Sequence, residues 1–140
     1  MELGRLQGLK TLILRYVPIG TGGAAALERL SQLESLDLYT GGRMVTDATV
    51  EQLKALPRLR HLNLNCSGLT DAGLDNLRSL PRLESLNLEH TEVTDAGLRK
   101  LAELINLEDL NLTYTAVTKN GLEWLRQRLP KTRIHKDHEN

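Results

Sequence analysis

Hydrophobic positions along the chain follow a pattern that repeats every 24 residues. Stretches beginning at Leu59, Leu83 and Leu107 match one another closely. Looser copies begin at Leu9 and Leu33, and the second of these spans 26 residues. Self-similarity at a period of about 20 to 29 residues is typical of a solenoid, in which each unit buries its apolar face only against its neighbours. The pattern therefore predicts a stack of similar units.

The unit that begins at Leu83 changes its hydrophobic period halfway. Its first half ends with Leu86 and Leu88 alternating with polar residues, which predicts a short strand with one buried face. Its second half places leucines at every third position from Leu98 to Leu104, which predicts a helix of about two to three turns, α-helical or partly 3₁₀. Each unit is expected to contain a strand, a turn, a helix and a second turn.

Polar residues and prolines mark the predicted ends of the helices. Thr94 precedes the helical leucines, and its hydroxyl can accept a hydrogen bond from a free backbone amide of the first turn. Asp95 adds a negative charge at the positive end of the helix. Pro57 and Pro81 follow the last helical leucine of their units, so the helix is expected to stop before the next strand.

Strands joined through helices must run parallel, and such crossovers are right-handed in nearly all proteins. We therefore predict an α/β fold in which a curved parallel sheet is backed by short helices, a right-handed solenoid of about five repeats. The length leaves no room for a second domain. The predicted organisation is one domain, 1–140, with a partial first unit at 1–8, repeats that begin at residues 9, 33, 59, 83 and 107, and a terminal strand and tail at 130–140.

The composition argues against several classes of partner. The 18 basic and 18 acidic residues cancel, and aromatic residues are only 3% of the chain, so neither the charge nor the stacking surface of a nucleic-acid-binding protein is present. No apolar run approaches the roughly 20 residues of a membrane helix, and the first residues do not resemble a secretory signal. The single cysteine, Cys66, cannot form an internal disulfide, which favours a reducing, cytoplasmic location.

The consensus of the units, LxxLxLxxTxVTDAGLxxLxxL, resembles the leucine-rich repeat family, in particular its Thr-Asp-Ala-Gly-Leu variety. The resemblance extends from Leu3 to about Lys136. This variety is similar to repeats of bacterial multi-repeat proteins and, more distantly, to the cysteine-containing repeats of F-box substrate receptors. The cysteine-containing type has Cys or Asn at its ninth position, whereas Cys66 lies one place early, which weakens the relation to F-box receptors. The ninth positions here are Val17, Gly41, Ser67, Thr91 and Thr115.

The two ends of the chain differ. Pro130 is followed by Thr132 and Ile134, which predict a sixth, terminal strand, and polar residues at leucine positions suit a final unit that faces water. At the other end, Leu3 and Leu6 match only the second half of a helix. An uncovered first strand exposes backbone donors and acceptors. We therefore expect either further repeats or another domain upstream, or pairing of this edge with a second copy to form a homo-oligomer.

Two segments depart from the repeat. A glycine-rich turn, Gly20 to Gly23, replaces Thr-Asp-Ala-Gly in the Leu9 unit, and such a turn before a helix can bind phosphate through its amides. It lacks the lysine and hydroxyl residue of a P-loop, so a looser turn is the preferred interpretation. In the Leu33 unit, two residues are inserted within Gly41 to Met44, and insertions in repeats often lie on the binding face.

Residues that alternate with the buried leucines point outward from the sheet, and equivalent positions of neighbouring units stack about 4.8 Å apart. The column from Ile13 to Asn111 is rich in carboxylates and amides and is expected to form hydrogen bonds between strands. The most variable columns carry tyrosine, arginine and histidine, which are typical interface residues. The candidate partner-binding residues on this face and on the inserted rim are Arg15, Tyr16, Tyr39, Arg43, His61, Asn65, Glu89, His90, Thr113 and Tyr114.

One column combines His61, Ser85 and Asp109 and invites comparison with a catalytic triad. In a triad the histidine lies between the other two residues, whereas here Ser85 is in the middle. Strand amides are engaged in the sheet and cannot form an oxyanion hole. His135 and His138 have no cysteine or further histidine nearby to complete a metal site. We therefore expect no enzymatic activity, catalytic residue, metal site or cofactor.

These observations predict a non-enzymatic protein-protein interaction module that binds a protein partner on the concave face of the sheet, with no role for nucleic acid or membrane. An alternative is that the chain is the C-terminal part of a longer repeat protein, a substrate-recognition or scaffold region whose activity lies in an upstream domain. Substrate capture for a ubiquitin ligase or a bacterial effector would need a separate catalytic or adaptor domain.

Overall fold

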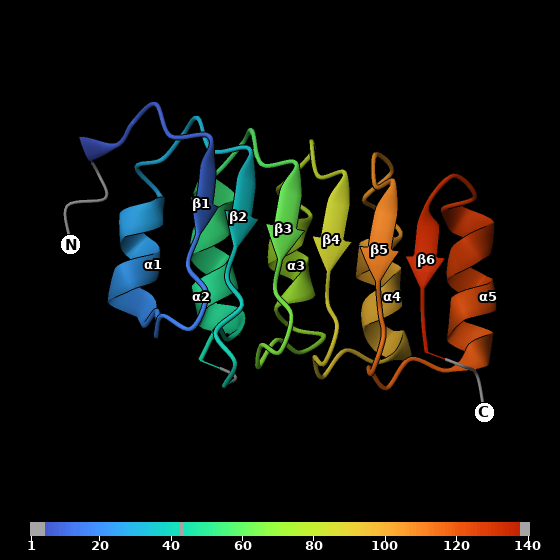
Figure 1. Ribbon diagram of the computed structural model, residues 1–140. Coiled ribbons are helices and arrows are strands. Elements are labelled where there is room, and N and C mark those ends of the chain that lie inside the picture. The colour runs from blue at the N-terminus through green and yellow to red at the C-terminus, as the bar shows by residue number, and fades with distance from the viewer. Residues whose placement is uncertain (1–4, 43, 138–140) are drawn as a thin grey trace.

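The computed structural model describes residues 5–42 and 44–137, whose strands form one six-stranded parallel sheet (Figure 1). The strands follow one another in chain order, from β1 at one edge to β6 at the other. Each strand is three residues long. They are β1 (Thr11–Ile13), β2 (Ser35–Asp37), β3 (His61–Asn63), β4 (Ser85–Asn87), β5 (Asp109–Asn111) and β6 (Arg133–His135).

Every strand pairs with its neighbour in the register that the repeat predicts. Leu36, Leu62, Leu86 and Leu110 occupy the same position on successive strands. The predicted terminal strand is confirmed, because Ile134 of β6 pairs with Leu110. The two inserted residues of the second repeat therefore do not disturb the sheet, since they lie in the turn after β2.

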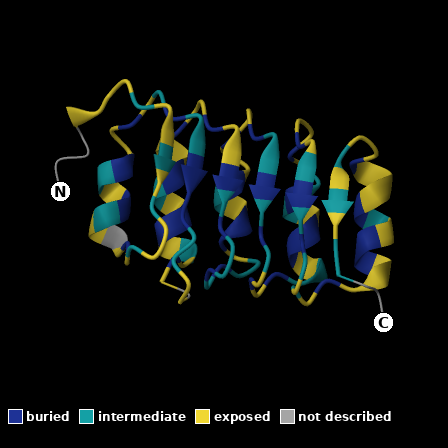
Figure 2. Cartoon of the chain, in the orientation of Figure 1, coloured by how far each residue is buried: buried dark blue, intermediate teal, exposed yellow. Residues whose placement is uncertain are grey.

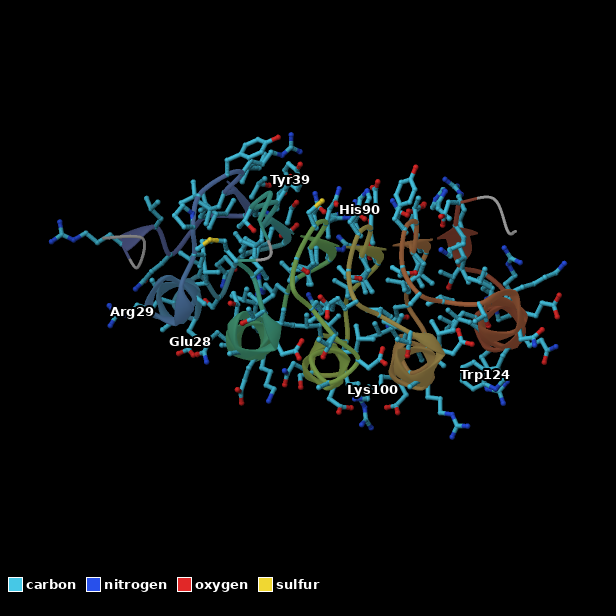
Figure 3. The ribbon with its side chains drawn as sticks, turned by 90° about the horizontal axis from the view of Figure 1, so that it is seen from below. Glu28, Arg29, Tyr39, His90, Lys100 and Trp124 are labelled. Atoms are coloured by element: carbon cyan, nitrogen blue, oxygen red, sulfur yellow. The ribbon has the colours of Figure 1, made fainter. Side chains whose placement is uncertain are left out.

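The helices form a second layer on one side of the sheet (Figure 3). Seen along the helices, the strands lie on the inside of a shallow arc and the helices on the outside, so the free face of the sheet is concave. No helix in the described ranges is long and apolar enough to span a membrane. The helical segments are α1 (Thr21–Leu27), α2 (Asp47–Gln52) continued by the 3₁₀ helix η2 (Leu53–Ala55), α3 (Leu74–Leu77), α4 (Asp95–Leu101) and α5 (Lys119–Arg128).

The core lies between sheet and helices and consists mostly of leucine (Figure 2). In the fourth repeat, Leu86 and Leu88 enter it from the strand, and Leu98 and Leu101 enter it from the helix. Each of these side chains is at most 1% exposed. The strand period and the helix period therefore converge on one core, which confirms the predicted solenoid.

The Thr-Asp-Ala-Gly motif joins the second, third and fourth repeats to the repeats that follow them. The Asp71 carboxylate accepts hydrogen bonds from the backbone N of Thr94 at 2.8 Å and from its Oγ1 at 2.6 Å. Thr94 Oγ1 in turn accepts from the amide of Ala96, so it caps α4 as predicted. Glycine follows because a Cβ at Gly97 would collide with the Asp71 carboxylate. We call the contact between the aspartate and the next threonine the Thr-Asp link.

Two further Thr-Asp links have the same geometry. Asp47 binds both donors of Thr70, and Asp95 binds both donors of Thr118. The charge that Asp95 was expected to supply to its own helix is therefore used mainly between repeats. Each link connects residues 23 apart in the sequence.

The first repeat lacks a Thr-Asp link. Thr21 stands where later repeats have aspartate. The N-cap of α1 is Gly20, which has no side chain to cap the helix. In the second repeat, the backbone N of Thr46 donates to Thr49 Oγ1 of its own helix at 3.3 Å. Thr49 occupies the position that is glycine in later repeats. Its Cβ is tolerated there because no aspartate approaches from the preceding repeat.

The unit at the other end is closed by the residues after β6. The backbone N of Tyr114 donates to Asp137 Oδ1 at 3.1 Å, whereas the equivalent N of His90 donates to the carbonyl of Thr113 at 3.0 Å. Lys136 Nζ lies 2.5 Å from the same Asp137 oxygen. The pKa of Asp137 is lowered, first by Lys136 and then by the Tyr114 amide. Asp137 therefore takes the place of the carbonyl that a further repeat would supply.

Candidate interaction surface

A column of polar side chains marks the ends of the strands, where the chain turns toward the edge of the concave face. We call this edge, formed by the residues that follow the strands, the rim. Asp37 accepts a hydrogen bond from the backbone N of Tyr39, and Asn63, Asn87 and Asn111 accept from the residue two places on, at 2.9 to 3.0 Å. One predicted bond between strands is present, from Asn63 Nδ2 to Asp37 Oδ1 at 3.1 Å. The shared contact of the column is nevertheless the local one, which forms an Asx turn.

The next residues on the rim share a left-handed backbone. Tyr16, Cys66, His90 and Tyr114 have φ angles of 55° to 57°, a region that residues other than glycine seldom adopt. Their backbone amides point to the repeat that follows or, for Tyr114, to the C-terminal cap, and these hydrogen bonds support the conformation. The insertion places Gly41 in the same region, with φ 68°.

Two pairs of rings lie along this rim. Tyr16 and Tyr39 meet edge to face with ring centroids 5.0 Å apart, and His90 and Tyr114 stack at 4.3 Å with an angle of 16° between their planes. Figure 3 shows Tyr39 and His90 extending from the concave side, away from the helices. Tyr16 is 70% exposed and Tyr114 is 58% exposed. The pKa of Tyr39 is raised, first by Tyr16 and then by Cys66.

A hollow of about 460 Å³ opens between the two ring pairs. Gly41, Gly42, Cys66 and His90 line it. Gly41 also lies close to the first ring pair. A Cβ at this position would be only 3.2 Å from the ring of Tyr16. The insertion and the column that contains Cys66 were visible in the sequence. Gly41 and Gly42 were expected only as part of the rim from Gly41 to Met44, and Cys66 was not predicted as a site residue, since none of the three has a side chain typical of an interface.

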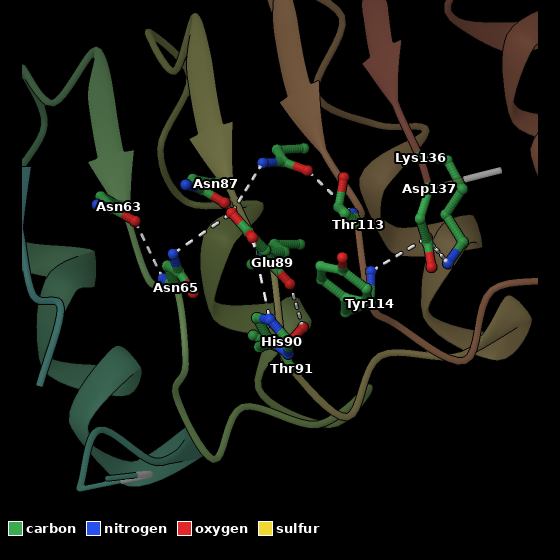
Figure 4. Close-up of polar contacts among 12 residues, drawn as sticks. Asn63, Asn65, Asn87, Glu89, His90, Thr91, Thr113, Tyr114, Lys136 and Asp137 are labelled. Carbon is green, nitrogen blue, oxygen red and sulfur yellow. Dashed lines mark hydrogen bonds and ion pairs between the residues drawn. The ribbon is translucent and has the colours of Figure 1, made fainter. Parts of the chain in front are cut away.

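Glu89 lies at the centre of a polar network on the concave face (Figure 4). Its Oε2 accepts hydrogen bonds from Asn65 Nδ2 at 3.4 Å and from Asn111 Nδ2 at 3.3 Å, so it connects three repeats. Its Oε1 lies 4.0 Å from His90 Nε2. The Glu89 side chain is 27% exposed, so the network does not bury it completely.

The predicted residue Arg15 forms an ion pair on the same face. Its Nη2 lies 2.7 Å from Asp37 Oδ2, and its Nε donates to the same oxygen at 2.8 Å. Only 12% of the Asp37 side chain is exposed, compared with 58% of Arg15. This pair therefore neutralises the carboxylate of Asp37.

The structure thus places the predicted residues in two groups. Arg15, Tyr16 and Tyr39 lie near β1 and β2. Asn65, Glu89, His90, Thr113 and Tyr114 lie on the three following repeats, and the hollow separates the groups. His61 is exposed on β3, while Arg43 lies outside the described residues.

The residues that suggested a triad stand in the order predicted from the repeat. His61 pairs with Ser85 and Ser85 with Asp109 across neighbouring strands, so His61 and Asp109 lie two strands apart. Asp109 Oδ2 instead lies 3.1 Å from His135 Nε2 on β6. His135 is thus a strand residue rather than part of a solvated tail, and His138 lies outside the described residues. No group of three or more His, Cys, Asp or Glu side chains within 5–42 and 44–137 is arranged to hold a metal ion.

Comparisons with known proteins agree with this architecture. Residues 51–117 match the family model described as leucine rich repeat. The crystal structure of an internalin (inlF) from Listeria monocytogenes aligns with a TM-score of 0.63 and 20% identity, over 99% of this chain and 44% of that chain. Internalin C2 (inlC2) from the same bacterium aligns with a TM-score of 0.57 and 17% identity, over 80% of this chain and 55% of that chain.

The chain spans about half the length of these internalins. A search of curated proteins found no match. At 17 to 20% identity the likeness to the internalins shows the fold alone. Together with the matched segment and the observed sheet, this likeness shows that the chain has the fold of a leucine-rich repeat solenoid.

Proposed function

We propose that this chain is a non-enzymatic protein-protein interaction module whose partner binds the concave face and the adjoining rim. The observation that carries the proposal is the presence of two ring pairs at the hollow, Tyr16 with Tyr39 and His90 with Tyr114. Aromatic side chains are enriched at interfaces because they bury a large area with little loss of conformational freedom. Elsewhere among the described residues, Trp124 on α5 has Arg128 over its ring at 4.0 Å but is not paired with a second aromatic ring.

Two features support this surface over the helical side. The rings and Glu89 directly follow strands whose hydrogen bonds and leucine core fix their positions, so binding orders few side chains. The helical side instead carries exposed ion pairs such as Arg78 with Glu103 and Lys100 with Asp75. Exposed pairs of this kind are typical of a solvated face.

The test compares two multiple-substitution variants. The first replaces Tyr39, Asn65, Glu89 and Tyr114 with alanine. The control variant replaces residues on the helical side. Its alanine substitutions are at Lys54, Arg99, Glu123 and Gln127, all of which are exposed.

Affinity capture with quantitative mass spectrometry would be run on the wild type and both variants. Proteins retained by the wild type and by the control should be lost from the concave variant. Equal retention by all three, with circular dichroism showing that each variant is folded, would contradict the proposed surface.

A second candidate is that the chain forms part of a longer repeat array. It is favoured by β1, whose outer edge is unpaired within the described residues and whose Leu12 is only partly buried. A preceding repeat would cover both. Fusing one idealised repeat before residue 9 should then raise the stability of the first repeat. An unchanged unfolding curve would contradict this candidate.

A further inference from the structure

The hollow on the rim is an open slot of about 460 Å³, large enough to admit a side chain of a partner. Equivalent positions on neighbouring strands are about 4.8 Å apart, so the second and fourth repeats are separated by about 10 Å. Gly41 and Gly42 in the second repeat and Cys66 in the third fill little of this space. The His90 ring, stacked on Tyr114, forms one wall. The His90 side chain is 49% exposed, so its ring leaves a surface for a planar group that enters the slot.

Among the described residues, the charge beside the His90 wall is negative. Of the two carboxylates on this part of the concave face, Asp37 is neutralised by Arg15 at 2.7 Å. Glu89, whose carboxylate approaches His90, is held by the neutral amides of Asn65 and Asn111. In the contacts among described residues, no guanidinium or ammonium group reaches Glu89. The network fixes the position of this charge without neutralising it.

We infer that the partner inserts an arginine side chain into this slot, with its guanidinium against the His90 ring and paired with Glu89. This inference rests on the proposed function and specifies the chemistry of the partner. A guanidinium is planar and weakly hydrated, stacks on ring faces and donates hydrogen bonds to carboxylates. One such group can therefore stack on the His90 ring and pair with the Glu89 carboxylate. A partner's glutamate would be repelled by Glu89, and a partner's leucine or tyrosine would leave that charge unpaired.

The probes are four capped pentapeptides, acetyl-Gly-Ser-X-Ser-Gly-amide, with X as arginine, lysine, tyrosine or glutamate. Each is titrated to about 10 mM into the isotopically labelled full chain, and backbone amide resonances are followed by NMR. The arginine peptide should give saturable shifts at Gly41, Gly42, Cys66 and His90. We expect the lysine peptide to bind about threefold more weakly, because a point charge does not stack. The glutamate peptide should leave these resonances unchanged.

Two variants separate the charge from the fold. Glu89→Gln keeps the shape of the side chain and should weaken binding of the arginine peptide at least fivefold. Glu123→Gln removes the same charge from the helical side and should leave the affinity within a factor of about 1.5. Raising the ionic strength from about 0.05 M to 0.5 M should weaken binding to the wild type and have little effect on Glu89→Gln.

Three results would overturn the inference. They are the absence of saturable shifts with the arginine peptide, equal or tighter binding of the tyrosine or glutamate peptide, and an affinity unaffected by Glu89→Gln in a variant whose other resonances are unchanged. None of these results would affect the conclusion from the capture experiment with the concave variant, because that experiment does not depend on arginine. Failure of the capture experiment alone would contradict the proposed function while leaving a cation-binding slot.

Discussion

The first repeat and the interior repeats use the same leucine pattern but are joined to their neighbours in different ways. From the second repeat on, each aspartate of the Thr-Asp-Ala motif binds the next threonine through two hydrogen bonds. The first repeat has Thr21 at that position and no Thr-Asp link. Its helix α1 contacts α2 without the polar connection that joins the later helices.

The difference shows that the motif belongs to the interface between two repeats rather than to one repeat. Gly73, Gly97 and Gly121 each face the aspartate of the repeat before, and a Cβ at any of them would collide with it. In the second repeat, which follows the repeat that has Thr21 in place of aspartate, Thr49 stands in place of the glycine. Aspartate in one repeat and glycine in the next are therefore a matched pair.

The largest effect on stability should come from the leucine column of the strands, which the first repeat and the interior repeats share. Leu86→Ala removes a side chain that is 1% exposed and should lower the free energy of unfolding by about 2 to 5 kcal/mol. Leu12→Ala, at the equivalent position of the edge strand, should lower it by about 1 kcal/mol because Leu12 is already partly open to water.

Urea unfolding followed by circular dichroism measures both changes. Fluorescence of Trp124, the one tryptophan of the chain, reports separately on α5 in the last repeat. Equal losses for the two variants would mean that the edge strand is as well packed as the interior, which would break the comparison.

The fold was predictable because its determinants are local and periodic. The alternation around Leu86 and the threefold spacing after Leu98 each define one element, and copying them gave the register of the whole sheet. The Thr-Asp link was not predicted because its two partners lie 23 residues apart and each has a sufficient local explanation as a helix cap. The aspartate of the cap was assigned to its own helix, although its carboxylate reaches the next one.

The candidate surface was only partly predictable for a related reason. The repeat fixed which residues lie on the concave face, including Glu89 and Tyr114. It did not fix how their side chains pair, because stacking of His90 on Tyr114 depends on a left-handed backbone after the strand. The hollow arises where Gly41 and Gly42 lengthen one turn, and absent side chains leave little signal in a sequence.

A second prediction breaks one Thr-Asp link directly. Asp71→Ala removes both acceptors of Thr94 and should lower the free energy of unfolding by about 2 to 3 kcal/mol, because hydrogen bonds to a carboxylate are stronger than neutral ones. The matched control Glu51→Ala breaks only an exposed ion pair with Lys54 and should change stability by less than about 0.5 kcal/mol. Urea unfolding compares the two, and similar values would show that the link adds nothing to the interface.

The smallest expected effects have opposite signs in the two regions. Gly97→Ala places a Cβ against Asp71 and Leu74 and should destabilise the protein by about 1 to 2 kcal/mol. Gly22→Ala in α1 meets no atom within 4 Å and should stabilise it by about 0.5 to 1 kcal/mol, because alanine favours a helix over glycine.

Thermal and urea unfolding of the single variants and of Asp71→Ala combined with Gly97→Ala would measure the coupling in a double-mutant cycle. If the aspartate and the glycine are a matched pair, Gly97→Ala should cost less once Asp71 has been removed, since part of the collision is gone. Strictly additive losses would show that glycine is required for another reason, such as the contact with Leu74. The coupling therefore decides whether the interior repeats are distinguished from the first by one interaction or by two independent ones.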